Sequence, residues 1–390
     1  WVLDWIQKNR DDTMTEFFSN SPPYWMTISG CSSGSTSTAK PNPNMPDDML
    51  DDYVEYFLDV YEYLVSQGFT FDYLQPFNES TSGQWHGITG SQEGCDFTIN
   101  QKIETLALLQ DECKKRGIDL GYNFSDEVDS SKEVEVFSDL YNSNFVASNG
   151  MTGKDIINNA AKFTYHIYGY NNGSTSWLRR AANLFDKEIE MSEICWTRGD
   201  EHDVDDMKTA FQYSTSIIDV LKYGGAQSYI FWQGVEDKVG QINGKTNYGL
   251  LQGVYYTAEE AMEKGVDIAS LGLSYQDVTT SKAYYVSGQY SKYMKKGYTM
   301  IECLGDRAIA AVSPGGDQVV IVKQNDSNSS NEITFNLDGF NATEVTKVTT
   351  DSTRNWAKEY LTVSGSTFKD TVSASSVTTY IIDGVQTLVR

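Results

Sequence analysis

Two glutamates, each at the end of an apolar run, are the residues of this chain best suited to chemistry. Glu79 closes the string Gln75-Pro76-Phe77-Asn78-Glu79, and Glu193 follows the run that ends at Met191-Ser192. Polar loop residues follow both. Paired carboxylates at strand ends can divide the work, one transferring a proton and the other attacking as a nucleophile, as in double-displacement cleavage of a glycosidic bond. Taken singly, each is more often a solvated surface acid.

The composition limits the partners and cofactors that fit. The formal net charge is −24, with 54 acids against 30 Lys and Arg and no basic cluster, which argues against nucleic acid and anionic membranes. The sequence contains no apolar run of 18 residues, so it predicts no membrane-spanning helix. The five cysteines form no C-x-x-C pair and the three histidines have no metal-ligand spacing. We therefore expect no metal and no cofactor, and a neutral ligand. The many aromatic residues can stack on sugar rings, although aromatics more often fill cores.

Strand-like and helix-like patterns alternate as far as about residue 295. The expected strands are 15–20, 71–78, 119–124, 163–168, 188–196 and 227–233. The expected helices are 1–9, 47–66, 98–116, 132–147, 175–184 and 204–223, then a long loop and a last helix at 281–296. Repeated βα units imply a parallel sheet wrapped by helices, and polar residues at the strand ends favour a (β/α)8 barrel. Only six units are found, so we expect an N-terminally truncated barrel whose first two strands are absent from this chain.

Beyond residue 297 short β-branched runs replace this alternation. They are 308–312, 318–322, 332–335, 344–348 and 377–382, separated by turns rich in Asp, Asn, Ser and Gly. This pattern is typical of an antiparallel β-sandwich. The predicted domains are thus an α/β barrel over 1–297 and a β-sandwich side domain over 298–390.

Five strand-end motifs, in order, resemble those of glycoside hydrolase family 30. They are Ser19-Asn20-Ser21-Pro22-Pro23-Tyr24-Trp25-Met26-Thr27, Phe77-Asn78-Glu79, His166-Ile167-Tyr168-Gly169, Ser192-Glu193-Ile194-Cys195-Trp196 and Tyr229-Ile230-Phe231-Trp232-Gln233. The first looks most like the endo-β-1,6-galactanase branch. The resemblance covers nearly the whole chain and implies a (β/α)8 barrel with a side β-sandwich. Each motif alone is weak, and Ser80 stands where family members usually have proline.

The resemblance implies roles for particular residues. Glu79, on the fourth barrel strand, would be the acid/base, and Glu193, on the seventh, the nucleophile. The substrate-binding residues would be Asn78, Trp25, His166, Tyr168, Trp232 and Trp196.

The residues themselves add detail to these roles. Asn78 can hydrogen-bond a sugar 2-OH. His166 and Tyr168 alternate onto one face of their strand, and Tyr168 is a candidate donor to Glu193. Asp126 and Glu127 end the preceding strand and are further candidates for the site. The alternative, purely structural roles are a core histidine for His166 and barrel packing for the tryptophans. Retention of configuration requires carboxyl groups ~5–5.5 Å apart, and a separation near ~9 Å would contradict it.

The leading hypothesis is a retaining endo-hydrolase of β-1,6-galactan, extracellular or at the cell surface and monomeric, with a polysaccharide or oligosaccharide as its partner. Other substrates for the same barrel are β-1,6-glucan, a glucosylceramide-like glucoside and xylan. A hypothesis of another class is a carbohydrate-binding fragment without turnover. Missing barrel strands would leave sheet edges open, so we expect little activity from this chain alone.

Overall fold

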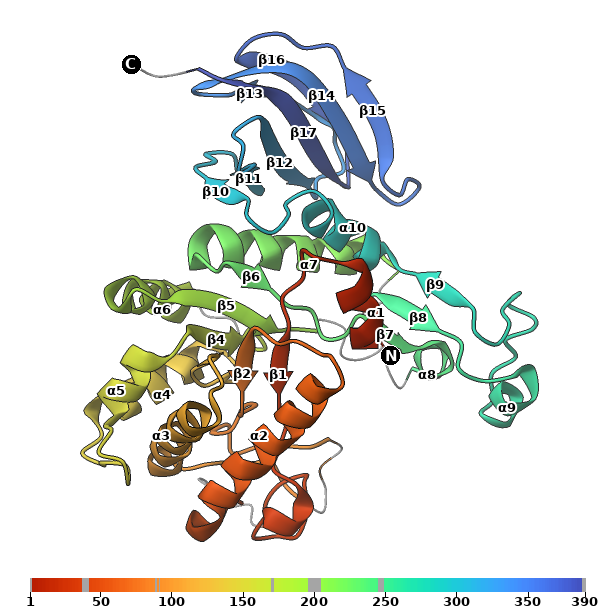
Figure 1. The fold of residues 1–390 in the computed structure, drawn as a ribbon. Helices are drawn as coiled ribbons and strands as arrows, with labels where there is room; N and C mark the ends of the chain where they lie inside the picture. The colour runs from red at the N-terminus through yellow and green to blue at the C-terminus, as the bar shows by residue number, and fades with distance from the viewer. Residues whose placement is uncertain are drawn as a thin grey trace. The chain divides into compact units, whose positions relative to one another are not determined.

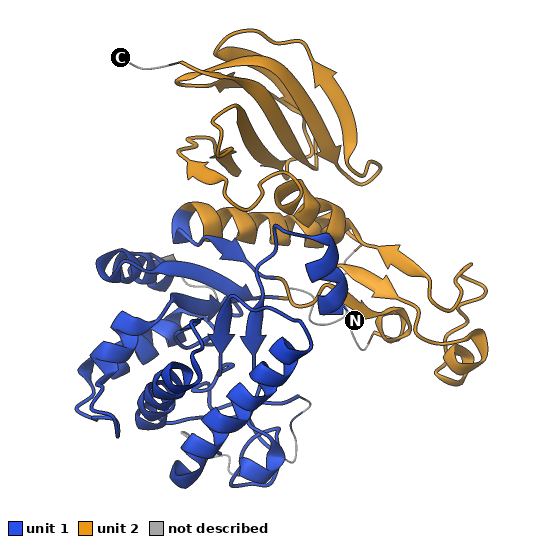
Figure 2. Ribbon diagram, in the orientation of Figure 1, with its two compact units in different colours: residues 1–194, 223–230 blue, residues 195–222, 231–390 orange. Residues whose placement is uncertain are grey.

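The computed structural model describes residues 2–36, 42–87, 90, 92–169, 172–195, 205–244 and 249–387. The chain divides into two compact units (Figure 2). Unit 1 is Trp1–Ile194 with Tyr223–Ile230, and unit 2 is Cys195–Lys222 with Phe231–Arg390. This division differs from the domain boundary at 297, which remains a prediction. None of the described helices is long and apolar enough to cross a membrane.

Unit 1 contains six short parallel strands (Figure 1). They are β1 (Glu16–Phe18), β2 (Tyr73–Gln75), β3 (Gly121–Tyr122), β4 (Lys162–His166), β5 (Glu188–Glu193) and β6 (Ser228–Tyr229). The sheets β1-β2-β3 and β4-β5-β6 are linked by parallel bridges that pair Asn123 with Lys162 and Glu127 with Tyr165. All six predicted strands are therefore present and adjacent in chain order. Within the described residues no ladder joins β6 to β1.

Helices precede and connect these strands. They are α1 (Val2–Asn9), α2 (Leu50–Ser66), α3 (Ile99–Arg116), α4 (Ser130–Asn142), α5 (Gly153–Asn159) and α6 (Asn172–Phe185), with short 3-10 turns η1 (Tyr24–Met26) and η2 (Asp47–Met49). Helix α3 begins at a Thr98/Gln101 capping box and ends at Gly117, whose φ of 70° suits glycine. The prediction of one helix over 132–147 is wrong in extent, because Ser143 is extended and a second capping box at Thr152 starts α5.

Strand β4 shows how the sheet presents polar groups to its interior. Phe163 packs on the rings of Phe124 and Phe137 beneath the helices. Since side chains alternate along a strand, Lys162, Thr164 and His166 share the other face. Each contacts residues of other strands or strand ends: Lys162 binds Glu16, Thr164 accepts from Gln75, and His166 meets Glu79. A polar interior face therefore runs from the beginnings of the strands to their ends.

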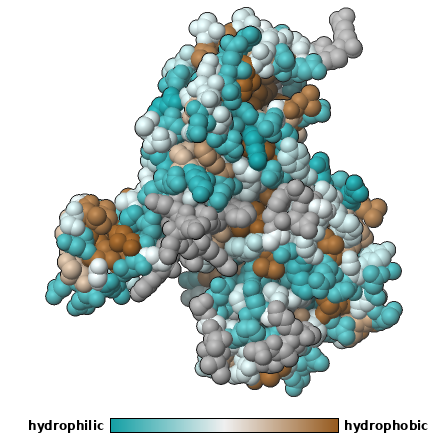
Figure 3. Space-filling view, turned by 180° about the vertical axis from the view of Figure 1, so that it is seen from behind, coloured by the Kyte–Doolittle hydropathy of each residue, from teal (hydrophilic) through white to brown (hydrophobic). Residues whose placement is uncertain are grey.

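Unit 2 begins with α7 (Met207–Ile218), the start of a π-helical turn η3 (Asp219–Gly224), and a small lobe. The lobe contains β7 (Val235–Asp237), α8 (Lys238–Ile242), β8 (Leu251–Gly253), α9 (Ala258–Glu263) and β9 (Val278–Thr280), and α10 (Lys282–Ser291) follows. The prediction of a long loop before the last helix is therefore wrong. Each strand has only three residues, too few to show a period. The lobe has its own core around Val239, Val254 and Ile268, and apolar side chains gather on its surface (Figure 3).

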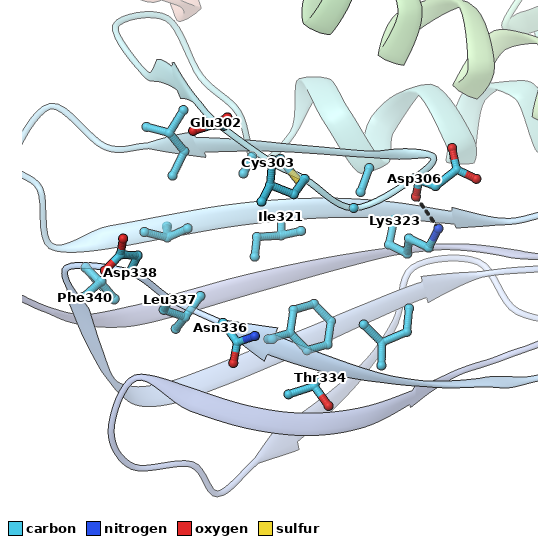
Figure 4. Close-up of a pocket in the computed structure, with 18 residues that line it drawn as sticks. Glu302, Cys303, Asp306, Ile321, Lys323, Thr334, Asn336, Leu337, Asp338 and Phe340 are labelled. Carbon is cyan, nitrogen blue, oxygen red and sulfur yellow. Dashed lines mark hydrogen bonds between the residues drawn. The ribbon is translucent and has the colours of Figure 1, made fainter.

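The C-terminal β domain has two antiparallel sheets. Its strands are β10 (Thr299–Ile301), β11 (Ala308–Val312), β12 (Gln318–Asn325), β13 (Asn331–Asn336), β14 (Phe340–Thr350), β15 (Ala357–Leu361), β16 (Thr367–Val372) and β17 (Ser376–Gln386). The sheet order is β10-β11-β12-β17-β14-β15, and β13 pairs with β16. Phe335, Phe368 and Tyr380 pack in the core that the sheets share. A cavity of about 730 Å³ opens beside Ile321 and Leu337 (Figure 4).

Candidate active site

Glu79 lies just after β2 in a backbone held from two directions. Its amide donates to the carbonyl of Asp126 over 2.8 Å, and its carbonyl accepts from the indole of Trp85 over 3.0 Å. Its φ is +47°, a conformation that is uncommon for a residue with a side chain and that clusters at functional sites. The local fold therefore fixes where the Glu79 carboxylate points.

Glu193 reaches the same place because β5 contains a bulge. Tyr165 pairs with Met191, but the next residue, His166, pairs with Glu193, so Ser192 is an extra residue. Ser192 donates to the carboxylate of Asp126, while Glu193 accepts from the hydroxyl of Tyr168 over 2.7 Å. A bulge can re-aim a side chain, and this one brings two consecutive residues into one polar cluster. The hydrogen bond expected from Tyr168 is present.

His166 lies between the two glutamates and is fully buried. Its Nδ1 is 2.8 Å from Oε1 of Glu79 and 3.9 Å from Oε1 of Glu193. Its Nε2 is 3.3 Å from Oδ2 of Asp126, an ion-pair contact rather than a well-aligned hydrogen bond. Burial opposes a charge on the ring, yet Asp126 and then the two glutamates raise the pKa of His166 well above its usual value. The site therefore favours an imidazolium.

The carboxylates respond to the same surroundings. Burial raises the pKa of Glu193 above its ordinary value, although the charge on His166 and the Tyr168 hydroxyl both oppose that rise. Burial acts in the same direction on Asp126, but there His166 and the Ser192 hydroxyl prevail and lower its pKa. Asp126 is thus held ionised, and Glu193 depends on His166 and Tyr168 for its charge.

Oxygen atoms of Glu79 and Glu193 and a ring nitrogen of His166 all lie within 4.8 Å of one another. These are also donor types that metal ions use. The His166 ring contacts carboxylates on both sides, so the three residues form a charge cluster with Asp126. This cluster offers two carboxylates at short range with a cation between them.

For the other predicted site residues the structure gives fewer contacts with the two glutamates. Asn78 is buried beside Glu79, and among the described residues its Oδ1 has no hydrogen-bond partner. Trp25 is 58% exposed and contacts the ring edges of Tyr24 and Tyr56 rather than the glutamates. Trp232 belongs to unit 2, and Trp196 lies outside the described residues. The structure thus brings together Glu79, Glu193, His166 and Tyr168.

Sequence reasoning missed Gln84, whose side-chain amide donates to Oε2 of Glu79. No pattern around Gln84 signals this contact, because the loop between the two residues determines it. Asp126 was a candidate from its place at a strand end, but its contact with His166 was not foreseen. Its φ of +69° is a second sign, visible only in the structure.

Comparisons with known proteins agree with the fold. Residues 1–136 match the model of O-glycosyl hydrolase family 30. An endo-β-1,6-galactanase of Hypocrea rufa is 24% identical over 323 residues, 83% of this chain and 57% of that protein. The chain thus spans little more than half the length of this curated relative.

Solved structures show the same architecture. A conserved exported protein from Bacteroides fragilis aligns with a TM-score of 0.72 at 20% identity, covering 98% of this chain and 78% of that one. The family 30 subfamily 8 xylanase Xyn30A of Clostridium acetobutylicum gives 0.68 at 18% identity, covering 95% and 80%. The fold is therefore a TIM-type barrel with a C-terminal β domain. The chain is therefore similar in sequence to O-glycosyl hydrolase family 30 over residues 1–136 and to an endo-β-1,6-galactanase over 323 residues.

Proposed function

We propose that the protein is a retaining glycoside hydrolase in which Glu79 is the acid/base and Glu193 the nucleophile. The observation that carries this proposal is the approach of the two carboxylates, whose nearest oxygens lie within 4.8 Å. Retaining enzymes hold their carboxyl groups ~5–5.5 Å apart, whereas inverting enzymes need ~6.5–9.5 Å to admit a water molecule. The short separation therefore favours direct attack by Glu193.

The reaction proceeds in two displacements. In the first, the Glu193 carboxylate attacks the anomeric carbon while Glu79 gives its proton to the departing glycosidic oxygen, forming a glycosyl ester. In the second, the Glu79 carboxylate takes a proton from water, and the water oxygen displaces Glu193 from the same carbon. Two inversions restore the original configuration. Tyr168 and His166 stabilise the Glu193 anion before attack, and Asn78 is placed beside Glu79 to hydrogen-bond the 2-OH.

The substrate that we propose is β-1,6-galactan, such as the side chains of arabinogalactan, cleaved within the chain by an extracellular or cell-surface monomer. The similarity to an endo-β-1,6-galactanase over 83% of this chain supports that choice. β-1,6-glucan, xylan and a glucosylceramide-like glucoside are the competing substrates.

The first test offers the purified protein each of these substrates at equal concentration and follows the reducing ends released. Galacto-oligosaccharides released from β-1,6-galactan at least about tenfold faster than products from the others are the expected result. Proton NMR of the first product should show the β-anomer before mutarotation. Preferential cleavage of glucan or xylan would overturn the galactan assignment, and an initial α-product would overturn retention.

The second test separates the roles of the two glutamates by chemical rescue. In Glu79→Ala, azide should accept the glycosyl group from the Glu193 ester and yield a β-glycosyl azide. In Glu193→Ala, azide should occupy the vacated space, attack the substrate directly and yield the α-azide. The opposite pairing would reverse the two roles.

The same assays address the other sequence-based expectations. Saturable binding of galactan without turnover, unchanged in Glu193→Gln, would favour a carbohydrate-binding fragment. The proposal that two further strands complete the barrel is tested by adding the residues encoded upstream and repeating the assay. Equal activity with and without them would contradict it.

A further inference from the structure

The double displacement moves one negative charge across the site. Before the first step the charge is on Glu193, and in the glycosyl ester it is on Glu79, which has given up its proton. This argument rests on the proposed function. His166 Nδ1 is 3.9 Å from Glu193 and 2.8 Å from Glu79, so a single imidazolium lies within a few ångströms of the charge at both stages. What keeps that ring charged and in place is therefore a question about catalysis.

Asp126 is connected to every part of this arrangement. Its Oδ2 faces Nε2 of His166 at 3.3 Å, and its Oδ1 accepts from Ser192, the residue next to Glu193. Its backbone carbonyl accepts from the amide of Glu79. The side chain is only 4% exposed and the residue is held at φ +69°. One residue thus supports both glutamates and the cation between them.

We propose that Asp126 is a positioning residue whose carboxylate holds His166 as a permanent imidazolium shared by Glu79 and Glu193. The ring keeps both N–H groups throughout. It neither donates nor accepts a proton, and protons move only between Glu79, the leaving oxygen and water. Because His166 is close to each carboxylate in turn, transfer of the charge leaves no anion without a partner in a buried site, where an unpaired charge is costly.

The charged and titratable groups around His166 come from four places in the fold. Asp126 follows β3, Glu79 follows β2, Glu193 ends β5, and Tyr168, whose ring centre is 5.8 Å from that of His166, follows β4. Burial lowers the pKa of His166 while the carboxylates raise it, with Asp126 foremost among them. Glu79 and Glu193 lose or share their charge during the reaction, and only Asp126 takes no part in the chemistry. It is therefore the counterion that stays constant.

The test is Asp126→Asn, which keeps the shape of the side chain and the backbone bond to Glu79 and removes only the charge. The readout is NMR of protein with ¹³C-labelled histidine, titrated with pH. The chain has three histidines, and a His166→Gln sample identifies the signal of His166. Wild-type His166 should stay protonated well above the pH at which an ordinary histidine, with a pKa of ~6.5, loses its proton. In Asp126→Asn it should titrate at least ~1 pH unit lower, the scale of removing an adjacent charge.

Ser192→Ala is the matched control, since it removes the other contact of the Asp126 carboxylate without removing charge. It should leave the titration of His166 close to wild type. An unchanged titration in folded Asp126→Asn would overturn the proposal. This readout needs no turnover, so it separates failure of the proposal from failure of the proposed hydrolase activity.

Kinetics test the catalytic consequence. Asp126→Asn should lower kcat by about 100-fold, the scale of a misplaced catalytic group, with KM changed less than about threefold. The alkaline limb of its kcat profile should move to lower pH, a change that a purely structural role would not produce. Loss of kcat with an unmoved alkaline limb would overturn the proposed role in catalysis.

Discussion

The interior of unit 1 holds two charge clusters of the same make-up at opposite ends of its strands. The carboxyl-end cluster is Glu79, His166 and Glu193, and the amino-end cluster is Glu16, Lys162 and Glu190. In each, one cation lies between two glutamates. Strands β4 and β5 contribute a residue to both clusters. Composition therefore does not tell them apart.

The partners and the exposure of the clusters do differ. Lys162 is 3.0 Å from Glu16 and 3.1 Å from Glu190, and its ammonium lies 3.6 Å above the ring of Tyr73. Ser228 also donates to Glu190, whose side chain is only 1% exposed, whereas that of Glu193 is 19% exposed. Glu190 is thus enclosed by protein groups, while Glu193, the proposed nucleophile, is more open to a ligand. In barrels of this type the carboxyl ends of the strands carry the active site and the amino ends carry stability.

The strongest test of the difference between the two clusters is the same substitution at each end of β5. Glu193→Gln should lower kcat/KM roughly 10⁴-fold or more, because it removes one member of a catalytic unit. Glu190→Gln should keep kcat/KM within about tenfold of wild type and lower the melting temperature instead. Both are measured on galactan, with thermal unfolding of the same samples. Comparable losses of turnover in the two variants would mean that the ends are not functionally distinct.

A second contrast concerns the cation of the amino-end cluster. Lys162→Met should lower the free energy of unfolding by about 3 kcal/mol, since it leaves buried carboxylates without their partner. The KM of the folded fraction should be unchanged. Urea denaturation measures the loss, and Lys162→Arg, which keeps the charge, should recover part of it. A stable but inactive Lys162→Met would place this lysine in catalysis and contradict the assignment.

A third prediction concerns Tyr168, which contacts Glu193 in the carboxyl-end cluster. Its hydroxyl opposes the rise in the pKa of Glu193, so Tyr168→Phe should raise that pKa further. Glu193 must be ionised to act as the proposed nucleophile, and activity should therefore be lost at a higher pH as the solution is acidified. The expected loss of kcat/KM on the acid side is about tenfold, from one hydrogen bond to a charged group. A pH profile identical to wild type would show that the hydroxyl does not support the anion.

The smallest effect is expected at Glu16. Burial, together with the neighbouring Glu190, raises the pKa of Glu16 to about 8 despite the nearby Lys162. A carboxyl whose pKa is higher in the folded than in the unfolded state stabilises the fold at low pH, and that contribution is lost as pH rises through the folded value. Glu16→Gln should therefore flatten the decline in melting temperature between about pH 5 and pH 8. A decline as steep as in wild type would contradict this origin.

Much of unit 1 follows from its sequence for physical reasons. Its six strands alternate with helical patterns and are followed by polar residues, so the strand order and the meeting of Glu79 with Glu193 could be predicted. Contacts set by loops could not. Gln84 reaches Glu79 only because residues 80–83 turn back, and no periodicity encodes that turn. The β7–β9 lobe was missed because three-residue strands carry too little alternation to recognise.

The extra residue in β5 also separates the side-chain alternation of the two ends of the strand. Without it, Glu190 and Glu193 would face opposite sides of the sheet, since they are an odd number of residues apart. With it, the alternation before Ser192 is independent of the alternation after it. A change of register before the bulge would then alter the face that Glu190 occupies while Glu193, the proposed nucleophile, keeps its pairing with His166. The two ends of a single strand can thus be redesigned one at a time.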